Sequence, residues 1–290
     1  MASDVRTLVE GDDVSTWATM KLCRAVQHFN DFSTRVSQWN ASRVYRAPLR
    51  VSDDREFVEF LQPVGTRPPV EEWGLHFGDA IHNIRAALDC VVWEFAHLDG
   101  GRPEKPNQVM FPVINNQSEW RAAAARLKTV PADLLGRIEA VQPFNSPDSS
   151  PEANWLSMIS RLDNDDKHRG VIVGLPLLDH VLMEGMAIQL GESRPGMEGQ
   201  FATQFNLDNL ADGEPFARFS FGALIESGSV LPPHAVVGMG ASVRYREDII
   251  PVAAIEQDGL AYAHRVIQFL RSGSFPDDSV VIEPERLKNV

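Results

Sequence analysis

Two short segments concentrate side chains that could perform acid–base or anion-binding chemistry. They are GDAIHNIRAALD, residues 78–89, and RLDNDDKHRG, residues 161–170. If the first segment is helical, His82, Arg85 and Asp89 are spaced three and four residues apart, so their side chains can touch. Arginine binds phosphate or carboxylate, histidine transfers protons near neutral pH, and aspartate orients either one. This face could therefore hold a ligand or a substrate anion.

The same pattern has a purely structural interpretation. Arg85 and Asp89 can form an i,i+4 pair that satisfies itself where the helix meets its neighbours. His82 can be a hydrogen-bonded, partly buried histidine. Both interpretations stay open from the sequence.

The second segment also has a structural and a functional interpretation. Lys167, His168 and Arg169 precede Gly170, and cations in the last turn of a helix that ends at glycine complement the helix dipole. In the functional interpretation, His168 and Arg169 project into a pocket shared with the first segment. The expected site then has four candidate catalytic residues and four candidate ligand-binding residues. The catalytic candidates are His82, Arg85, His168 and Arg169, and the ligand-binding candidates are Asn83, Asp89, Arg161 and Lys167.

A metal site is a further alternative on the first of these helices. Glu72, His76 and Asp79 lie at i, i+4 and i+7 and could ligate a metal. The sequence shows no second helix with matching ligands, so no metal is expected. Because no Walker loop, dinucleotide-binding glycine fingerprint, nucleophile elbow or His-Glu-x-x-His motif is present, no cofactor is expected either.

The two segments together resemble an uncharacterised protein family of actinobacteria and their phages. Its members carry a similar Gly-Asp-x-x-His-Asn-x-Arg segment and a later Asp-Lys-His-Arg segment. The likeness covers mainly residues 70–170 and brings no known activity with it. It implies that seven residues belong together, namely His82, Asn83, Arg85, Asp89, Lys167, His168 and Arg169.

A more distant resemblance is to HEPN domains, helical modules of microbial toxin and antiviral systems. Their motif is arginine, four to six residues, then histidine, and Arg161 and His168 have six residues between them. Leu162 stands where the motif prefers a polar residue. The resemblance implies a metal-independent ribonuclease active in phage–host conflict, with its site at a helix–helix dimer interface.

Composition limits the classes of partner. The formal net charge is -13, from 40 acidic and 27 basic residues, which argues against non-specific binding to nucleic acid or an anionic membrane. The two cysteines, Cys23 and Cys90, have no Cys-x-x-Cys spacing and are expected to be buried thiols. No apolar run approaches the roughly 20 residues of a membrane span, and residues 1–13 do not resemble a signal peptide. We therefore expect a cytoplasmic protein.

The elements that must position these residues follow from hydrophobic periodicity, which predicts an α+β fold. Long helices are expected at about 14–40, 70–97 and 151–168, a β-hairpin near 43–63, an antiparallel sheet at about 171–248, and a C-terminal helix at 252–272. We expect one composite domain over 1–290, in which residues 1–170 are mainly helical, residues 171–275 form a β-rich region plus the closing helix, and residues 276–290 are a tail. The closing helix is expected to cover the sheet, because a half-apolar sheet needs a cover.

The helical phases also predict a core. The helices at 70–97 and 151–168 should pack together and bury their apolar stripes. These stripes contain Ile81, Ile84, Leu88, Trp155, Ile159 and Leu162.

Two hypotheses on function follow. The first is a non-catalytic binding or interaction protein, with a protein partner or self-association as a homodimer. The alternative is a HEPN-like ribonuclease or related phosphoryl-transfer enzyme, in which His82 or His168 is the general acid or base and Arg85 and Arg169 stabilise the charge. RNA is a partner only in this alternative. Convergence of the four side chains on an open cavity would favour the enzyme, and a closed, fully paired cluster would favour the binding protein.

Overall fold

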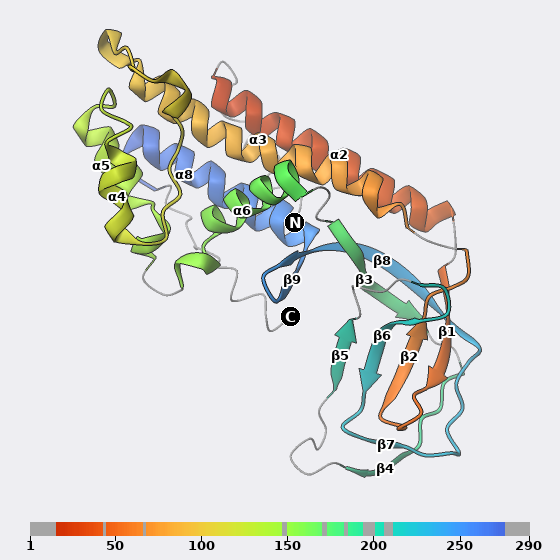
Figure 1. Cartoon of the computed structure of the whole chain (residues 1–290). Coiled ribbons are helices and arrows are strands. Elements are labelled where there is room, and N and C mark those ends of the chain that lie inside the picture. The colour runs from red at the N-terminus through yellow and green to blue at the C-terminus, as the bar shows by residue number, and fades with distance from the viewer. Residues whose placement is uncertain are drawn as a thin grey trace. The chain divides into compact units, whose positions relative to one another are not determined.

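A computed structural model of the chain shows an α+β fold (Figure 1). It describes residues 16–42, 45–65, 68–146, 150–169, 173–182, 185–193, 201–205 and 211–275. The chain divides into two compact units. The first comprises Met1–Ser33, Glu71–Val173 and Val243–Val290, and the second comprises Thr34–Val70 and Gly174–Ser242. The predicted tail and the first 15 residues lie outside the described residues.

Helices dominate the first unit. The long ones are α2 (Trp17–Ser42, up to Ser33 in this unit), α3 (Val70–Ala96), α6 (Trp155–Arg169) and α8 (Leu260–Ser272). Shorter ones are α4 (Gln117–Ala124), α5 (Ala132–Ala140) and α7 (Val252–Ala254), which continues into α8 through one π-helical turn, Ile255–Gly259. No helix of the described residues is both long enough and apolar enough to cross a membrane.

The apolar stripes of α3 and α6 form the core of this unit, as predicted. All six expected core residues, three from each helix, are at most 1% exposed. Phe29 of α2 meets Phe77 of α3 edge to face, with ring centroids 6.3 Å apart. The helical phase assigned from the sequence is therefore confirmed, and the opposite faces of both helices are left for polar residues.

The start of α6 differs from the prediction, which began this helix at residue 151. Pro151–Ala153 forms a 3-10 turn, and the α-helix begins at Trp155. The reason is local: the side chain of Asn154 accepts a hydrogen bond at 2.9 Å from the backbone N–H of Leu156. This is the usual way in which asparagine caps a helix N-terminus.

The C-terminal helix α8 also differs from its predicted role. Its apolar face, Leu260, Ala263, Val266, Ile267 and Leu270, is buried as expected. However, α8 packs on α5 and α6 and belongs to the first unit, whereas the prediction grouped it with the sheet region. Arg137 of α5 fixes this arrangement, because its guanidinium donates to the carbonyls of Leu270 and Arg271 at 3.0 and 2.8 Å.

The strands build a seven-stranded sheet in the order β3-β8-β1-β2-β6-β5, with β9 paired to β8. The strands are β1 (Tyr45–Val51), β2 (Phe57–Leu61), β3 (Val173–Leu182), β5 (Ala202–Phe205), β6 (Pro215–Ser220), β8 (His234–Tyr245) and β9 (Asp248–Pro251). The sequence placed the β1–β2 hairpin with the helices, whereas it lies in the middle of the sheet, between β8 and β6. The predicted single sheet over 171–248 is likewise corrected, because β4 (Leu190–Ser193) and β7 (Ala223–Ile225) form a separate two-stranded sheet.

The physical reason for the hairpin's position is its apolar content. Val58 and Phe60 of β2 are at most 1% exposed and pack with Phe216 of β6 and Val237 of β8. A hairpin alone is at best marginally stable in water, and the neighbouring strands β8 and β6 extend it into a larger sheet with a shared apolar core.

Candidate functional site

The first unit contains a cavity of about 480 Å³ beside the polar faces of α3 and α6. Its third wall is the irregular segment 108–114, and its fourth is the end of α4. Many of the predicted site residues line it. The lining residues are Arg85, Asp89, Gln108, Met110, Phe111, Pro112, Val113, Ile114, Ala123, Arg126, Leu127, Ser160, Asp163, Asn164, Lys167 and His168.

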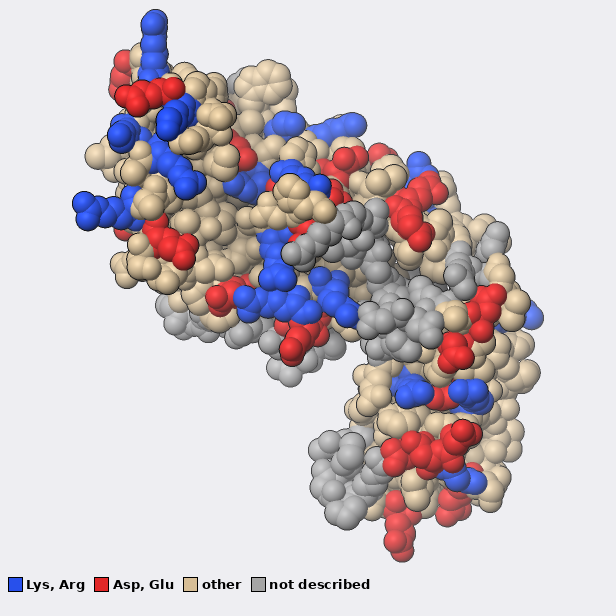
Figure 2. Space-filling model, in the orientation of Figure 1, with Lys and Arg blue, Asp and Glu red and all other residues tan. Residues whose placement is uncertain are grey.

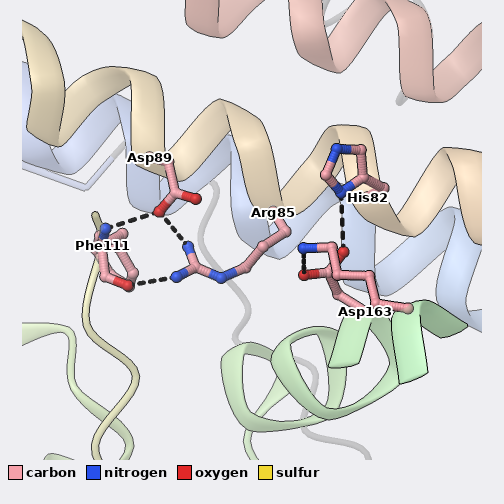
Figure 3. Close-up of polar contacts among 6 residues, drawn as sticks. His82, Arg85, Asp89, Phe111 and Asp163 are labelled. Carbon is pink, nitrogen blue, oxygen red and sulfur yellow. Dashed lines mark hydrogen bonds and ion pairs between the residues drawn. The ribbon is translucent and has the colours of Figure 1, made fainter. Parts of the chain in front are cut away.

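Arg85 and Asp89 hold the wall of the cavity in place (Figure 3). The Arg85 guanidinium donates to Asp89 Oδ1 at 2.7 Å and to the Phe111 carbonyl at 2.6 Å. The backbone N–H of Phe111 donates to the same Asp89 oxygen at 2.7 Å. Burial raises the pKa of the Asp89 carboxyl, although Arg85 and the Phe111 N–H lower it. Arg85 and Asp89 therefore position the backbone of Phe111. They form the i,i+4 ion pair that the structural interpretation of the sequence expects.

Two more side chains hold the same segment. The N–H of Ile114 donates to Gln142 Oε1 at 3.0 Å, and the Ser157 hydroxyl donates to Asn115 Oδ1 at 2.6 Å. Because 108–115 has no strand partner in the described part of the chain, side chains supply partners for its backbone groups at Phe111 and Ile114.

A buried carboxylate organises the other side of the cavity. Asp163 of α6 is 3% exposed, and it accepts from His82 Nδ1 at 3.0 Å and from Lys167 Nζ at 2.6 Å (Figure 3). About half of the His82 side chain is exposed. Asp163 was not among the predicted site residues, although its i,i+4 spacing to Lys167 was a readable signal. A carboxylate that holds one ring nitrogen of an accessible histidine fixes its tautomer and orientation.

A close approach between α3 and α6 depends on Gly78. A Cβ atom at this position would lie within 2.7 Å of the carboxyl group of Asp166. Burial raises the pKa of Asp166, and the neighbouring carboxylates Asp79 and Asp163 act in the same direction. The glycine of the GDAIHN segment therefore makes room for the acidic side chain of Asp166.

Two smaller cavities share lining residues with the main one. One, of about 270 Å³, shares Val113, Ser160 and Asn164 and adds Asn115, Ser157, Arg161, Tyr245 and Arg246. The other, of about 280 Å³, shares Gln108 and Arg126 and adds Arg102, Pro103, Glu104, Lys105, Ala125, Lys128 and Thr129.

The three adjoining cavities reverse the charge balance of the chain. Eight lining residues are Lys or Arg and three are Asp or Glu, whereas the whole chain has 27 basic and 40 acidic residues. Figure 2 shows Lys and Arg side chains gathered over α4 and α6, with smaller groups of Asp and Glu between them. This local excess is a feature that net charge conceals.

The predicted site residues are only partly brought together. Lys167 and His168 line the main cavity, and Arg161 lines the smaller one beside it. His82 contacts the cavity residue Asp163 but does not line the cavity itself. Asn83 is buried and donates to the carbonyl of Asp79 in its own helix. The side chain of Arg169 lies outside the described residues.

The arrangement therefore offers cationic groups to an anion; Asp163 orients His82 beside the cavity, and His168 lines the cavity. No protein-family model, curated protein or solved structure matches the chain.

Proposed function

We propose that the protein binds a small ligand that carries a phosphate group and an apolar portion, in the cavity between α3, α6 and 108–114. The observation that carries this proposal is the excess of cations around the cavity on an otherwise acidic chain. A volume of about 480 Å³ falls in the range of small-molecule pockets. The setting in phage–host conflict, and a protein partner or homodimer, remain predictions from the sequence.

Two cationic or ionisable side chains are available to such a ligand. Among the described residues, the side chains of Arg126 and His168 have no hydrogen-bond or ion-pair partner, and both line the cavity. Lys167 adds a third donor group, because an ammonium has three hydrogens and Asp163 takes one of them. These groups can form charge-assisted hydrogen bonds to phosphate oxygens.

Segment 108–114 and the end of α4 contribute an apolar wall to the same cavity. Met110, Pro112, Val113, Ala123 and Leu127 line it, and Met110 is 46% exposed. The phenyl ring of this wall, Phe111, is fully buried. Within the described residues the wall therefore lacks the exposed aromatic platform on which single-stranded RNA stacks its bases. The combination favours a small phosphorylated molecule over a nucleic-acid strand.

Replacing Arg126 with alanine should weaken binding of the phosphorylated ligand at least tenfold, about 1.4 kcal/mol, because one charge-assisted contact is lost. Calorimetric titration with pyrophosphate, nucleoside diphosphates and triphosphates, and a short RNA would measure it. Arg121→Ala is the matched control, since Arg121 is exposed on α4 and lines none of the three cavities. Equal losses in both variants, or no binding of any probe by the wild type, would contradict the proposal.

The HEPN-like alternative has one observation in its favour. Asp163 orients His82, and His168 and Arg161 occupy one side of α6 along the adjoining cavities. His82→Ala and His168→Ala should change stability by less than about 2 kcal/mol and abolish metal-independent RNA cleavage. His97→Ala, at an exposed histidine, is the control. Cleavage that survives in both variants, or its absence in the wild type, rules this alternative out.

A further inference from the structure

A second cluster of chemically capable side chains lies between α2 and α3, apart from the cavity residues. His28 and Asp31 of α2 and His76 of α3 each offer one ligand atom, and the three atoms lie within 4.8 Å of one another. The sequence offered only α3 residues for a metal and no second helix. The fold supplies this second helix, because α2 brings its own histidine and aspartate beside His76.

The buried histidine of this cluster lacks a partner. His28 is 8% exposed, and its Nδ1 is the only buried side-chain nitrogen or oxygen without a hydrogen bond in the described part of the chain. The Asp79 carboxylate is 3.8 Å from Nδ1, which is too long for a hydrogen bond. A buried polar atom in this state costs about 1–3 kcal/mol.

A bound metal ion would give the His28 imidazole a partner that the described residues do not supply. When one ring nitrogen of a histidine ligates a metal, the other usually faces a carboxylate or carbonyl, and the Asp79 carboxylate lies on the Nδ1 side of this ring.

The donor set selects the class of metal. Two imidazoles and one carboxylate are ligands of zinc and related divalent transition metals, whereas calcium and magnesium prefer oxygen alone. Three protein ligands leave a fourth tetrahedral position for water. The partly buried His76 and the exposed Asp31 give an ion access from solvent.

We propose that His28, Asp31 and His76 form a zinc-type metal site that ties α2 to α3. This site shares no residue with the three cavities, so it does not depend on the proposed anion binding. Its first consequence is a metal-dependent thermal stability, because an ion bound by both helices stabilises the folded state.

Titration of untagged, metal-free protein with zinc, against a chromophoric chelator, tests this site. We expect one equivalent bound by the wild type and a melting temperature that rises with zinc. Asp31→Asn and His76→Ala should each weaken zinc binding at least tenfold and remove the rise in melting temperature. His97→Ala is the matched control and should bind like the wild type. Cobalt(II) should give visible absorption bands in the wild type that both ligand variants lose.

Both ligand positions lie outside the fully buried core, so the variants should fold, and circular dichroism checks this. Zinc binding that is unchanged in Asp31→Asn and His76→Ala would overturn the proposal, as would the absence of binding by the wild type at micromolar zinc. An equal loss in His97→Ala would also overturn it, since the bound ion would then be on the surface histidines.

Discussion

Replacing Arg85 with alanine is expected to lower the free energy of unfolding by about 3 kcal/mol. The variant leaves the Asp89 carboxylate without its cation and the buried Phe111 carbonyl without its donor. Arg85 is 11% exposed and Asp89 is 36% exposed, so the loss should lie at the lower end of the range for buried pairs. Urea unfolding followed by circular dichroism would measure it.

The pH dependence of this loss distinguishes charge from packing. The pKa of Asp89 is already raised by burial, and removing Arg85 raises it further. The ionised carboxylate therefore destabilises the variant above its folded-state pKa, and the deficit should shrink as the pH falls through that pKa. A deficit that is constant with pH would indicate lost packing instead.

Arg161→Ala is the control for Arg85. Arg161 has the same i,i+4 spacing to an aspartate, but its nitrogen is 3.6 Å from Asp165 and its side chain is 48% exposed. Exposed pairs of this kind contribute at most about 1 kcal/mol. Similar losses of unfolding free energy in the two variants would show that the hydrogen bonds of Arg85 and Asp89 to Phe111 do not stabilise the first unit.

Replacing Gly78 with alanine should destabilise the protein by about 1–3 kcal/mol, although alanine is the better helix former. The new Cβ would lie within 2.7 Å of the Asp166 carboxyl group, so either that short side chain or the helix must shift. Thermal and urea unfolding would measure the change.

The same Gly78→Ala substitution, made in a protein that also carries Asp166→Ala, tests the cause of this loss of stability. In Asp166→Ala protein the clashing atoms are gone, and Gly78→Ala should then stabilise by up to about 1 kcal/mol. The sign of the effect at Gly78 is thus expected to reverse. Destabilisation of equal size in both backgrounds would mean that the glycine serves the helix backbone and not Asp166.

The sequence by itself determined the local structure of this protein. The stripe through Ile81, Ile84 and Leu88 fixed the phase of α3, because a buried helix repeats its apolar residues every 3.6 positions. The same phase placed Arg85 and Asp89 within reach of each other, and the structure joins them in an ion pair. The α+β class followed from the change of period after residue 170, and it is confirmed.

Contacts between distant segments were decided only by the tertiary structure. The hydrophobic periodicity of α3 does not indicate that Arg85 and Asp89 would hydrogen-bond to the backbone of Phe111, which lies 26 and 22 residues away in the sequence. The central position of the β1–β2 hairpin depends on pairing with β8, nearly 200 residues later in the chain. Strand pairing and side-chain clamps of this kind depend on which surfaces the whole chain must bury.

The two candidate sites divide in the same way. The sequence identified Lys167, His168 and Arg161 from their crowding, but the cavity they line needed the wall at 108–114 and the unpredicted cation Arg126. It also identified His76 but could not pair it with His28 and Asp31, because ligands on two helices meet only when those helices pack. Residue type and local spacing are written in the sequence, whereas convergence in space is set by the packing of one buried core against another.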